Sequence, residues 1–234
     1  SLLAIPVIFV WLIFRGELRT GIKTANPMAH VWRGLVGTSA MGLGFAGLWL
    51  LPLPEVTAIG YAAPLLVVIL AAMFLGEQIR LYRLSAVALG LVGVLIVLSP
   101  RFSAISEDVD LRHTLGAVLV LGSAFFAALA QVFVRKMVQI ERTSAIVFYF
   151  SVTATLLSLI TLPYGWVVPS WPVLGMLVLA GLLGGVGQIF LTSAYRFAEV
   201  SVIAPFEYTS MLLALLIGYF IFGEVPTLVM LFGA

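Results

Sequence analysis

The sequence predicts an all-α integral membrane protein assembled from two inverted halves, and three observations lead to this fold class. The composition is too apolar for a soluble domain. The apolar runs are long enough to cross a bilayer as helices. One helix of distinctive sequence occurs twice, at residues 55–77 and 199–224. Together these observations define the spans, their orientation and the region where a functional site is expected.

Composition separates this chain from soluble proteins. Of its 234 residues, 62% are hydrophobic and 9% are charged, whereas soluble domains average about 45–50% and about 25%. The apolar runs do not alternate with polar residues, so helices are expected rather than strands of a membrane barrel. The absence of cysteine excludes disulfides, thiolate metal sites and cysteine nucleophiles. The net charge of +2 is explained by basic loops, so no nucleic-acid partner is expected.

Seven complete spans are expected, with a further helical piece at each end of the chain. Leu2 to Phe14 is apolar but too short to span, and it lacks an initiator methionine and a cationic n-region, so it is interpreted as part of a truncated helix rather than a signal peptide. Pro226 to Ala234 is interpreted as the start of another truncated helix. The complete spans are expected at about 31–53, 55–76, 84–100, 113–134, 144–163, 171–195 and 200–223.

The distribution of basic residues predicts the orientation. When the basic loop Arg15 to Arg33 is placed in the cytoplasm, every one of the 12 lysines and arginines except Arg101 and Arg112 falls on that side. Cytoplasmic loops of membrane proteins carry such an excess of cations. Tryptophans are expected to mark the outer interface at Trp49, Trp166 and Trp171, and the inner interface at Trp32.

The repeated helix predicts the topology. Both copies open with Glu-Val-Thr/Ser-x-Ile, contain a proline and end with Gly-Glu. The second copy is the fifth span after the first, and because successive spans alternate in direction, the first copy runs inward and the second runs outward. The simplest completion is ten helices in two inverted halves of five. Residues 1–100 then form the first repeat without its first helix and with a partial second helix, 101–112 form an external linking loop, and 113–234 form the second repeat with a truncated last helix.

An inverted repeat across the membrane favours a secondary carrier that works by alternating access. Carriers built in this way bind substrate near the midplane, beside interrupted helices. Pro64 and Pro205 are the expected interruptions. Each lacks a backbone N–H and leaves the carbonyl four residues earlier without its helical partner, at Gly60 and Ser201. These carbonyls would be available to water, a substrate or a side chain.

Glu207 is the first candidate for a functional side chain. It follows Pro205 by two residues and lies about 12 Å along the helix from Glu199, at a rise of 1.5 Å per residue. Acids inside a membrane are costly and are by default functional, so Glu207 is a candidate to bind a substrate ammonium group or to couple protons. The alternative is a protonated acid bonded to the backbone that Pro205 frees. Ser210 shares its helical face.

Polar residues on neighbouring helices extend this candidate site. Thr38 lies in the first half, and Tyr61 lies beside Pro64, where it is expected to contact a ligand or to anchor at the interface. In the helix before Glu207, a stripe at spacings of three and four forms either a cavity wall or, through Gly181 and Gly185, a tight helix contact. This stripe consists of Gly181, Gly184, Gln188, Thr192 and Tyr195.

The sequence gives no support to an enzyme. The two histidines, His30 and His113, are interpreted as loop residues, and no His-Glu-x-x-His motif or serine elbow with a membrane histidine is present. No metal site and no cofactor are therefore expected. A membrane receptor or channel without a transport cycle is the alternative to a carrier, since seven complete spans are predicted.

Three stretches also resemble a known family. They are Glu-Val-Thr-Ala-Ile-x-x-Ala-Ala-Pro with Phe-Leu-Gly-Glu from residue 55, Gly-Leu-Val-Gly-Val-Leu-Ile-Val from residue 90, and Ala-Pro-Phe-Glu-Tyr-Thr-Ser with Phe-Gly-Glu from residue 204. They resemble the EamA-type carriers of the drug/metabolite transporter superfamily, over nearly the whole chain. The resemblance implies ten helices in two inverted five-helix repeats in a bacterial inner membrane, around a central cavity.

The resemblance also implies a function and a set of cavity residues. It implies a permease for small metabolites such as amino acids, nucleoside-like compounds, vitamins such as riboflavin, or drug-like compounds. The cavity would be bordered by the residues that match by position, which are Thr38, Tyr61, Pro64, Gln188, Pro205 and Glu207. The sequence leaves open the substrate, the direction of transport, coupling to protons, and whether the protein is a monomer or a homodimer in the lipid bilayer.

Overall fold

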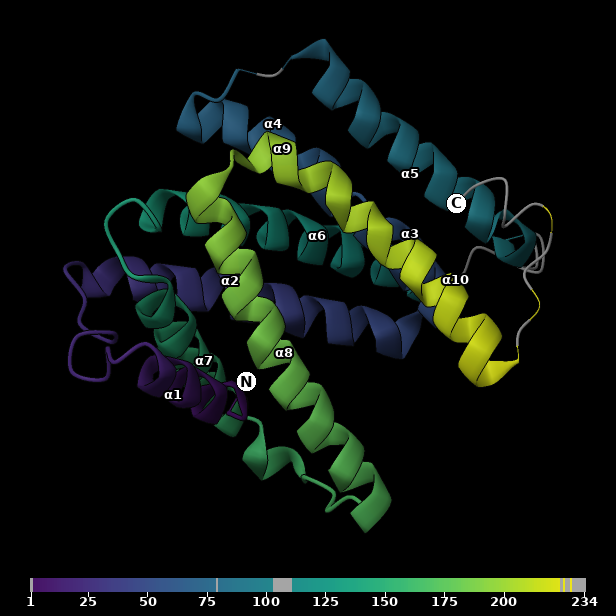
Figure 1. The fold of residues 1–234 in the computed structure, drawn as a ribbon. Coiled ribbons are helices and arrows are strands. Elements are labelled where there is room, and N and C mark those ends of the chain that lie inside the picture. The colour runs from purple at the N-terminus through teal and green to yellow at the C-terminus, as the bar shows by residue number, and fades with distance from the viewer. Residues whose placement is uncertain (1, 79, 103–110, 224, 226–227, 229–234) are drawn as a thin grey trace. The chain divides into compact units, whose positions relative to one another are not determined.

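The computed structural model describes residues 2–78, 80–102, 111–223, 225 and 228, and these residues form helices joined by short loops (Figure 1). The predicted all-α class is confirmed for this part of the chain. The elements are α1 (Ala4–Phe14), α2 (Pro27–Leu50), α3 (Leu53–Gly60), α4 (Ala63–Leu75), α5 (Leu81–Phe102), α6 (Leu111–Met137), α7 (Thr143–Leu159), η1 (Leu162–Tyr164), α8 (Trp171–Phe197), α9 (Val200–Ile203), η2 (Ala204–Tyr208) and α10 (Thr209–Phe222).

Every expected span corresponds to helical structure, with boundaries shifted by a few residues. The expected span 55–76 is divided into α3 and α4, and the expected span 200–223 is divided into α9, η2 and α10. The short opening segment is α1. The helix expected at 226–234 lies, apart from Leu228, outside the described residues. Within the described part, three segments have the length and hydropathy of a membrane span, namely Glu55–Leu75, Leu111–Met137 and Trp171–Phe197.

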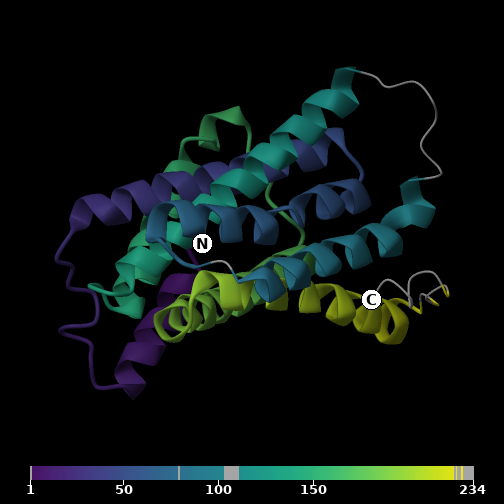
Figure 2. The same cartoon turned by 90° about the horizontal axis from the view of Figure 1, so that it is seen from above.

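The helices form two compact units, and each unit combines residues from both ends of the sequence. Unit 1 consists of residues 1–38 and 133–198, and unit 2 consists of residues 39–132 and 199–234. Helices α2 and α6 therefore each contribute residues to both units. A second view of the ribbon is given in Figure 2.

In unit 1, α1 packs against α7 and α8 (Figure 1). Its core is formed by the buried residues Ile8, Leu12, Val147 and Ile189. Two glycines of α8 allow α1 to approach closely. A Cβ atom at Gly181 would lie 2.7 Å from Leu3, and one at Gly185 would lie 2.8 Å from the Cα atom of Ala4. The pair Gly181 and Gly185 therefore serves helix packing, as the alternative interpretation of this region proposed.

In unit 2, small residues again bring helices together. The hydroxyl of Ser123 on α6 donates a hydrogen bond of 2.7 Å to the carbonyl of Ala40 on α2. Helix α5 packs against α3 and against η2. At this contact a Cβ atom on Gly90 would overlap the ring of Tyr208. Gly90 thus provides the space that Tyr208 occupies.

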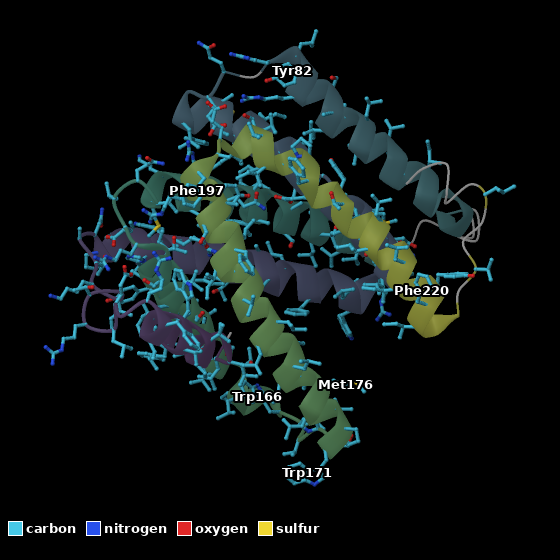
Figure 3. The ribbon with its side chains drawn as sticks, in the orientation of Figure 1. Tyr82, Trp166, Trp171, Met176, Phe197 and Phe220 are labelled. Carbon is cyan, nitrogen blue, oxygen red and sulfur yellow. The ribbon has the colours of Figure 1, made fainter. Side chains whose placement is uncertain are left out.

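Large apolar side chains are exposed along α8, as expected for a helix that faces lipid. Trp171 and Phe197, the first and last residues of α8, are 85% and 84% exposed. Figure 3 shows Met176 near Trp171, with Trp166 in the segment before the helix, and Phe197 at the other end. Aromatic residues at both ends of an apolar helix match the distribution that membrane interfaces favour.

Candidate functional site

Both predicted helix interruptions are present. In the first, α3 ends at Gly60, and α4 begins at Ala63 with Pro64 in its first turn. In the second, α9 ends at Ile203, and the chain continues as the 3₁₀ helix η2, which contains Pro205. Proline fits the first turn of a helix because its missing N–H would have no partner there. The two prolines therefore start new helical segments.

The two interruptions meet within unit 2. The hydroxyl of Tyr61, at the first break, shares a hydrogen bond of 2.8 Å with the hydroxyl of Ser210 on α10. The hydroxyl of Tyr208 donates to the carbonyl of Tyr61 at 3.2 Å. The two tyrosine rings stack, with their centroids 5.7 Å apart and their planes at 29°. Tyr61 thus contacts residues of the second break through both its side chain and its backbone.

Glu207 lies in η2, directly before Tyr208 and three residues before Ser210, the two residues that contact Tyr61. One of its carboxylate oxygens is inaccessible to solvent, while its backbone carbonyl accepts a hydrogen bond of 2.7 Å from the Ser210 hydroxyl. The regular α-helical spacing used to place Glu207 is wrong for this segment, because residues 204–208 form a 3₁₀ helix. A 3₁₀ helix rises about 2.0 Å per residue rather than 1.5 Å.

A polar cluster holds the start of α9 in unit 2. Both carboxylate oxygens of Glu77 accept backbone N–H groups, from Val200 at 3.1 Å and from Ser201 at 3.2 Å. The guanidinium of Arg83 binds the carboxylate of Glu199 and donates to the hydroxyl of Ser201 at 2.8 Å. The Glu77 carboxylate therefore caps a helix that begins more than a hundred residues later in the chain.

The other predicted site residues lie in unit 1. On α8, Thr192 and Tyr195 are buried and Gln188 is half-buried. The carbonyl of Tyr195 accepts a hydrogen bond of 2.6 Å from the guanidinium of Arg135. Thr38, on α2, is half-buried, and its hydroxyl has no hydrogen-bond partner among the described residues. Unit 2 thus brings together Tyr61, Pro64, Pro205, Glu207 and Ser210, while unit 1 holds Thr38, Gln188, Thr192 and Tyr195.

The prediction that His30 and His113 lie in loops is wrong. His30 is in the first turns of α2, where it is 2% exposed, and His113 is in α6. The His30 ring contacts the ring of Tyr149 on α7, with the centroids 4.6 Å apart and the planes tilted by 43°, and its Nε2 atom is 3.7 Å from the carboxylate of Glu141. Asn26 caps α2 by accepting the N–H of Ala29 at 3.2 Å, which starts the helix before the expected boundary.

Glu141 is a functional candidate that the sequence did not indicate, and it binds several groups at the basic end of unit 1. One of its carboxylate oxygens accepts hydrogen bonds from the Thr24 hydroxyl at 2.8 Å and from the N–H groups of Ala25 and Asn26 at 2.8 and 2.9 Å. Burial alone would raise the pKa of Glu141, but these hydrogen bonds and the neighbouring His30 lower it below its ordinary value. An acid in a short loop gives no signal in the sequence for this role.

Unit 1 also contains a cavity that is separate from the predicted site residues. It has a volume of about 230 Å³ and lies at the basic end of the unit, where Arg15, Arg142 and Arg196 line it. Arg142 forms an ion pair with Glu17 at 3.2 Å and a hydrogen bond with Thr20 at 3.0 Å, and Arg196 donates to the carbonyl of Glu141. None of the predicted site residues lines this cavity.

Three apolar segments of membrane length, together with two interrupted helices that meet, are typical of a multi-pass helical membrane protein of the transporter class. The model of the EamA-like transporter family matches residues 1–99 and 114–234, and the chain belongs to this family. The resemblance seen in the sequence is thereby confirmed, and the protein is a membrane transporter rather than an enzyme.

Several similar proteins are named as transporters of particular substrates. The chain is 27% identical to an S-adenosylmethionine uptake transporter of Rickettsia prowazekii, over 94% of this chain and 71% of that protein. It is 29% identical to a riboflavin transporter of Rhizobium johnstonii, over 91% and 68%. It is 31% identical to a pseudopaline exporter of Pseudomonas aeruginosa, over 95% and 76%.

A protein of known crystal structure has the same fold. It matches this chain with a TM-score of 0.81 and 21% sequence identity, and the match covers 99% of this chain and 79% of that protein.

Proposed function

We propose that this protein is a secondary transporter that moves a small polar metabolite across a bacterial inner membrane by alternating access of two inverted halves. Family membership and the names of the relatives support the transporter class. Those names cover S-adenosylmethionine, riboflavin and pseudopaline, which are small polar molecules. Both uptake and export occur among these names, so direction is a property to be measured.

The observation that carries this proposal is the meeting of the two broken helices in unit 2. Tyr61, beside the first break, is bonded to Ser210, beyond the second. Carriers with inverted repeats place their sites at such discontinuous helices, because the interrupted backbone leaves polar groups available for a ligand. We assign the unit 2 residues of the candidate site to substrate binding or coupling on this basis.

In this proposal Glu207 is the coupling residue. It lies in the 3₁₀ segment next to Tyr208, which contacts the first break, and one of its carboxylate oxygens is inaccessible to solvent. A carboxylate in such a position exchanges a proton or binds a substrate ammonium group. Proton-driven transport through Glu207 requires that its protonation state changes during the cycle.

The test is transport by the purified protein in proteoliposomes. Uptake and efflux of a metabolite panel are measured with and without a pH gradient. The proteins compared are the wild type, Glu207→Gln, and Asp108→Asn as a matched loss of one acid outside the candidate site. We expect one metabolite to move, and Glu207→Gln to abolish its dependence on the pH gradient while exchange of substrate persists. Unchanged pH dependence in Glu207→Gln would make this acid structural, and a channel is indicated if flux shows no saturation.

A further inference from the structure

Unit 1 contains a buried arginine that forms no ion pair with the residues that the structure describes. Arg33, in the second turn of α2, is 6% exposed. Its Nε and Nη1 atoms have no hydrogen-bond partner among the residues that the structure describes. Its guanidinium lies over the ring of Phe150 on α7, with Cζ 4.0 Å from the ring centroid.

The acidic residues of unit 1 interact with residues other than Arg33. This unit contains two carboxylates, Glu17 and Glu141. Glu17 pairs with Arg142 at 3.2 Å. Glu141 accepts three hydrogen bonds from residues 24–26 and lies 3.7 Å from His30. Unit 1 therefore holds a buried positive charge for which it supplies no counter-ion.

The position of this guanidinium depends on a glycine one helical turn further along α2. A Cβ atom at Gly37 would overlap the Nη1 atom of Arg33 and would lie 2.9 Å from the Cε2 atom of Phe150. The space that a side chain would fill at residue 37 is thus occupied by the guanidinium. Gly37 and Phe150 together fix the plane of the group between α2 and α7.

A guanidinium has five N–H donors in a planar fork that matches the oxygens of a carboxylate or a phosphate. Burying its charge is unfavourable unless it is paired and hydrogen-bonded. The contact with Phe150 compensates only part of this cost, since a cation–π contact supplies no hydrogen-bond acceptor. An anion from outside the chain would satisfy both the charge and the unfilled donors.

We propose that Arg33 binds the anionic oxygen group, a carboxylate or a phosphate, of the small molecule that the protein transports. The inference rests on the proposed function, because alternating access opens the interior of a carrier during its cycle and so gives a solute a route to a buried residue. The arginines that line the cavity of unit 1 differ from Arg33, since Arg142 and Arg196 have protein partners.

The test compares probes that differ only in the anionic group. Methionine and methioninamide test for a carboxylate, adenosine monophosphate and adenosine test for a phosphate, and acetate and inorganic phosphate test the bare anions. Each probe is added at millimolar concentration to the detergent-solubilised protein at constant ionic strength, and the melting temperature and the probe affinity are measured. The variants are Arg33→Met, Arg33→Lys and Gly37→Ala, with Arg19→Met as an exposed arginine of the same unit.

We expect at least one probe with an anionic group to raise the melting temperature of the wild type and of Arg19→Met, while its partner without that group does not. Arg33→Met should weaken binding of that probe about thirtyfold or more, as expected for removal of one partner of a buried charge pair. Without probe, Arg33→Met should melt at the same temperature as the wild type or higher, because the unpaired charge is gone. Gly37→Ala should weaken binding although the arginine remains.

Two results would overturn the inference. One is an anion response that is equal in the wild type and Arg33→Met, and the other is a wild type that responds to none of the anionic probes. Transport in proteoliposomes separates this failure from failure of the proposed function. If the wild type and Arg33→Met transport a metabolite equally well, the protein is a transporter but Arg33 does not bind the anionic group of its substrate. The absence of any transported metabolite refutes the proposed function itself.

Discussion

Helix α8 contains two adjacent glycines that differ in what an added methyl group would meet. At Gly185 a Cβ atom would lie 2.8 Å from the Cα atom and 3.0 Å from the Cβ atom of Ala4 on α1. At Gly184 nothing lies within 4 Å of that position. The neighbour at Gly185 includes backbone, which cannot rotate away. We therefore expect Gly185→Ala to separate α1 from α8 and Gly184→Ala to leave their packing intact.

The difference between the two variants has a definite magnitude. Both substitutions gain the same intrinsic helix preference of alanine over glycine, about 0.8–1 kcal/mol. Only Gly185→Ala adds an overpacking cost of about 1–3 kcal/mol. The intrinsic gain cancels in the comparison, so Gly185→Ala should be about 1–3 kcal/mol less stable than Gly184→Ala. For a chain of this size that corresponds to a melting temperature lower by about 2–12 °C.

Intrinsic tryptophan fluorescence during heating in detergent measures this difference, since the chain has 5 tryptophans and no cysteine for thiol-reactive dyes. Equal melting temperatures for the two variants would refute the contact between α1 and α8. A lower melting temperature for Gly184→Ala than for Gly185→Ala would refute the orientation of α8 within unit 1.

Two further predictions concern polar contacts. The Tyr61 to Ser210 hydrogen bond should give a coupling of about 0.5–1.5 kcal/mol in a double-mutant cycle of Tyr61→Phe and Ser210→Ala, read from thermal stability; strictly additive effects would contradict the contact. The lowered pKa of Glu141 means that its stabilising effect is present above its ordinary range near pH 4.5 and is lost as the pH falls through the lower folded-state pKa. The melting temperature of the wild type should therefore fall in that acidic window relative to Glu141→Gln, and parallel pH profiles would contradict this assignment.

The helices and their interruptions could be predicted because their signals are local. A long apolar run identifies a span without reference to the rest of the chain. A proline identifies a break because its effects extend only four residues back. Pro64 and Pro205 therefore predict the two interruptions, one between α3 and α4 and one between α9 and η2. They do not predict that residues 204–208 form a 3₁₀ helix, so the regular α-helical spacing used for Glu207 is wrong.

The contacts that join these elements could not be predicted, because they link residues far apart in the chain. The sequence indicates Tyr61 and Ser210 separately as site candidates. Because 149 positions separate them, no helical spacing rule predicts their contact. The Glu77 carboxylate appeared only as the end of a repeated motif. Its role as a cap for α9 depends on the packing of α4 beside α9 in unit 2.

Arg33 shows how a hydropathy boundary can hide a buried charge. The expected span began at residue 31, so Arg33 was counted with the basic loop. The sequence contains a second signal, because Asn26 followed by Pro27 is a typical helix start. In the structure Asn26 accepts the N–H of Ala29, and α2 begins at Pro27. Capping residues therefore locate the start of this helix earlier than hydropathy does. With this start, Arg33 lies in the second turn of α2, where its guanidinium packs against Phe150 of α7.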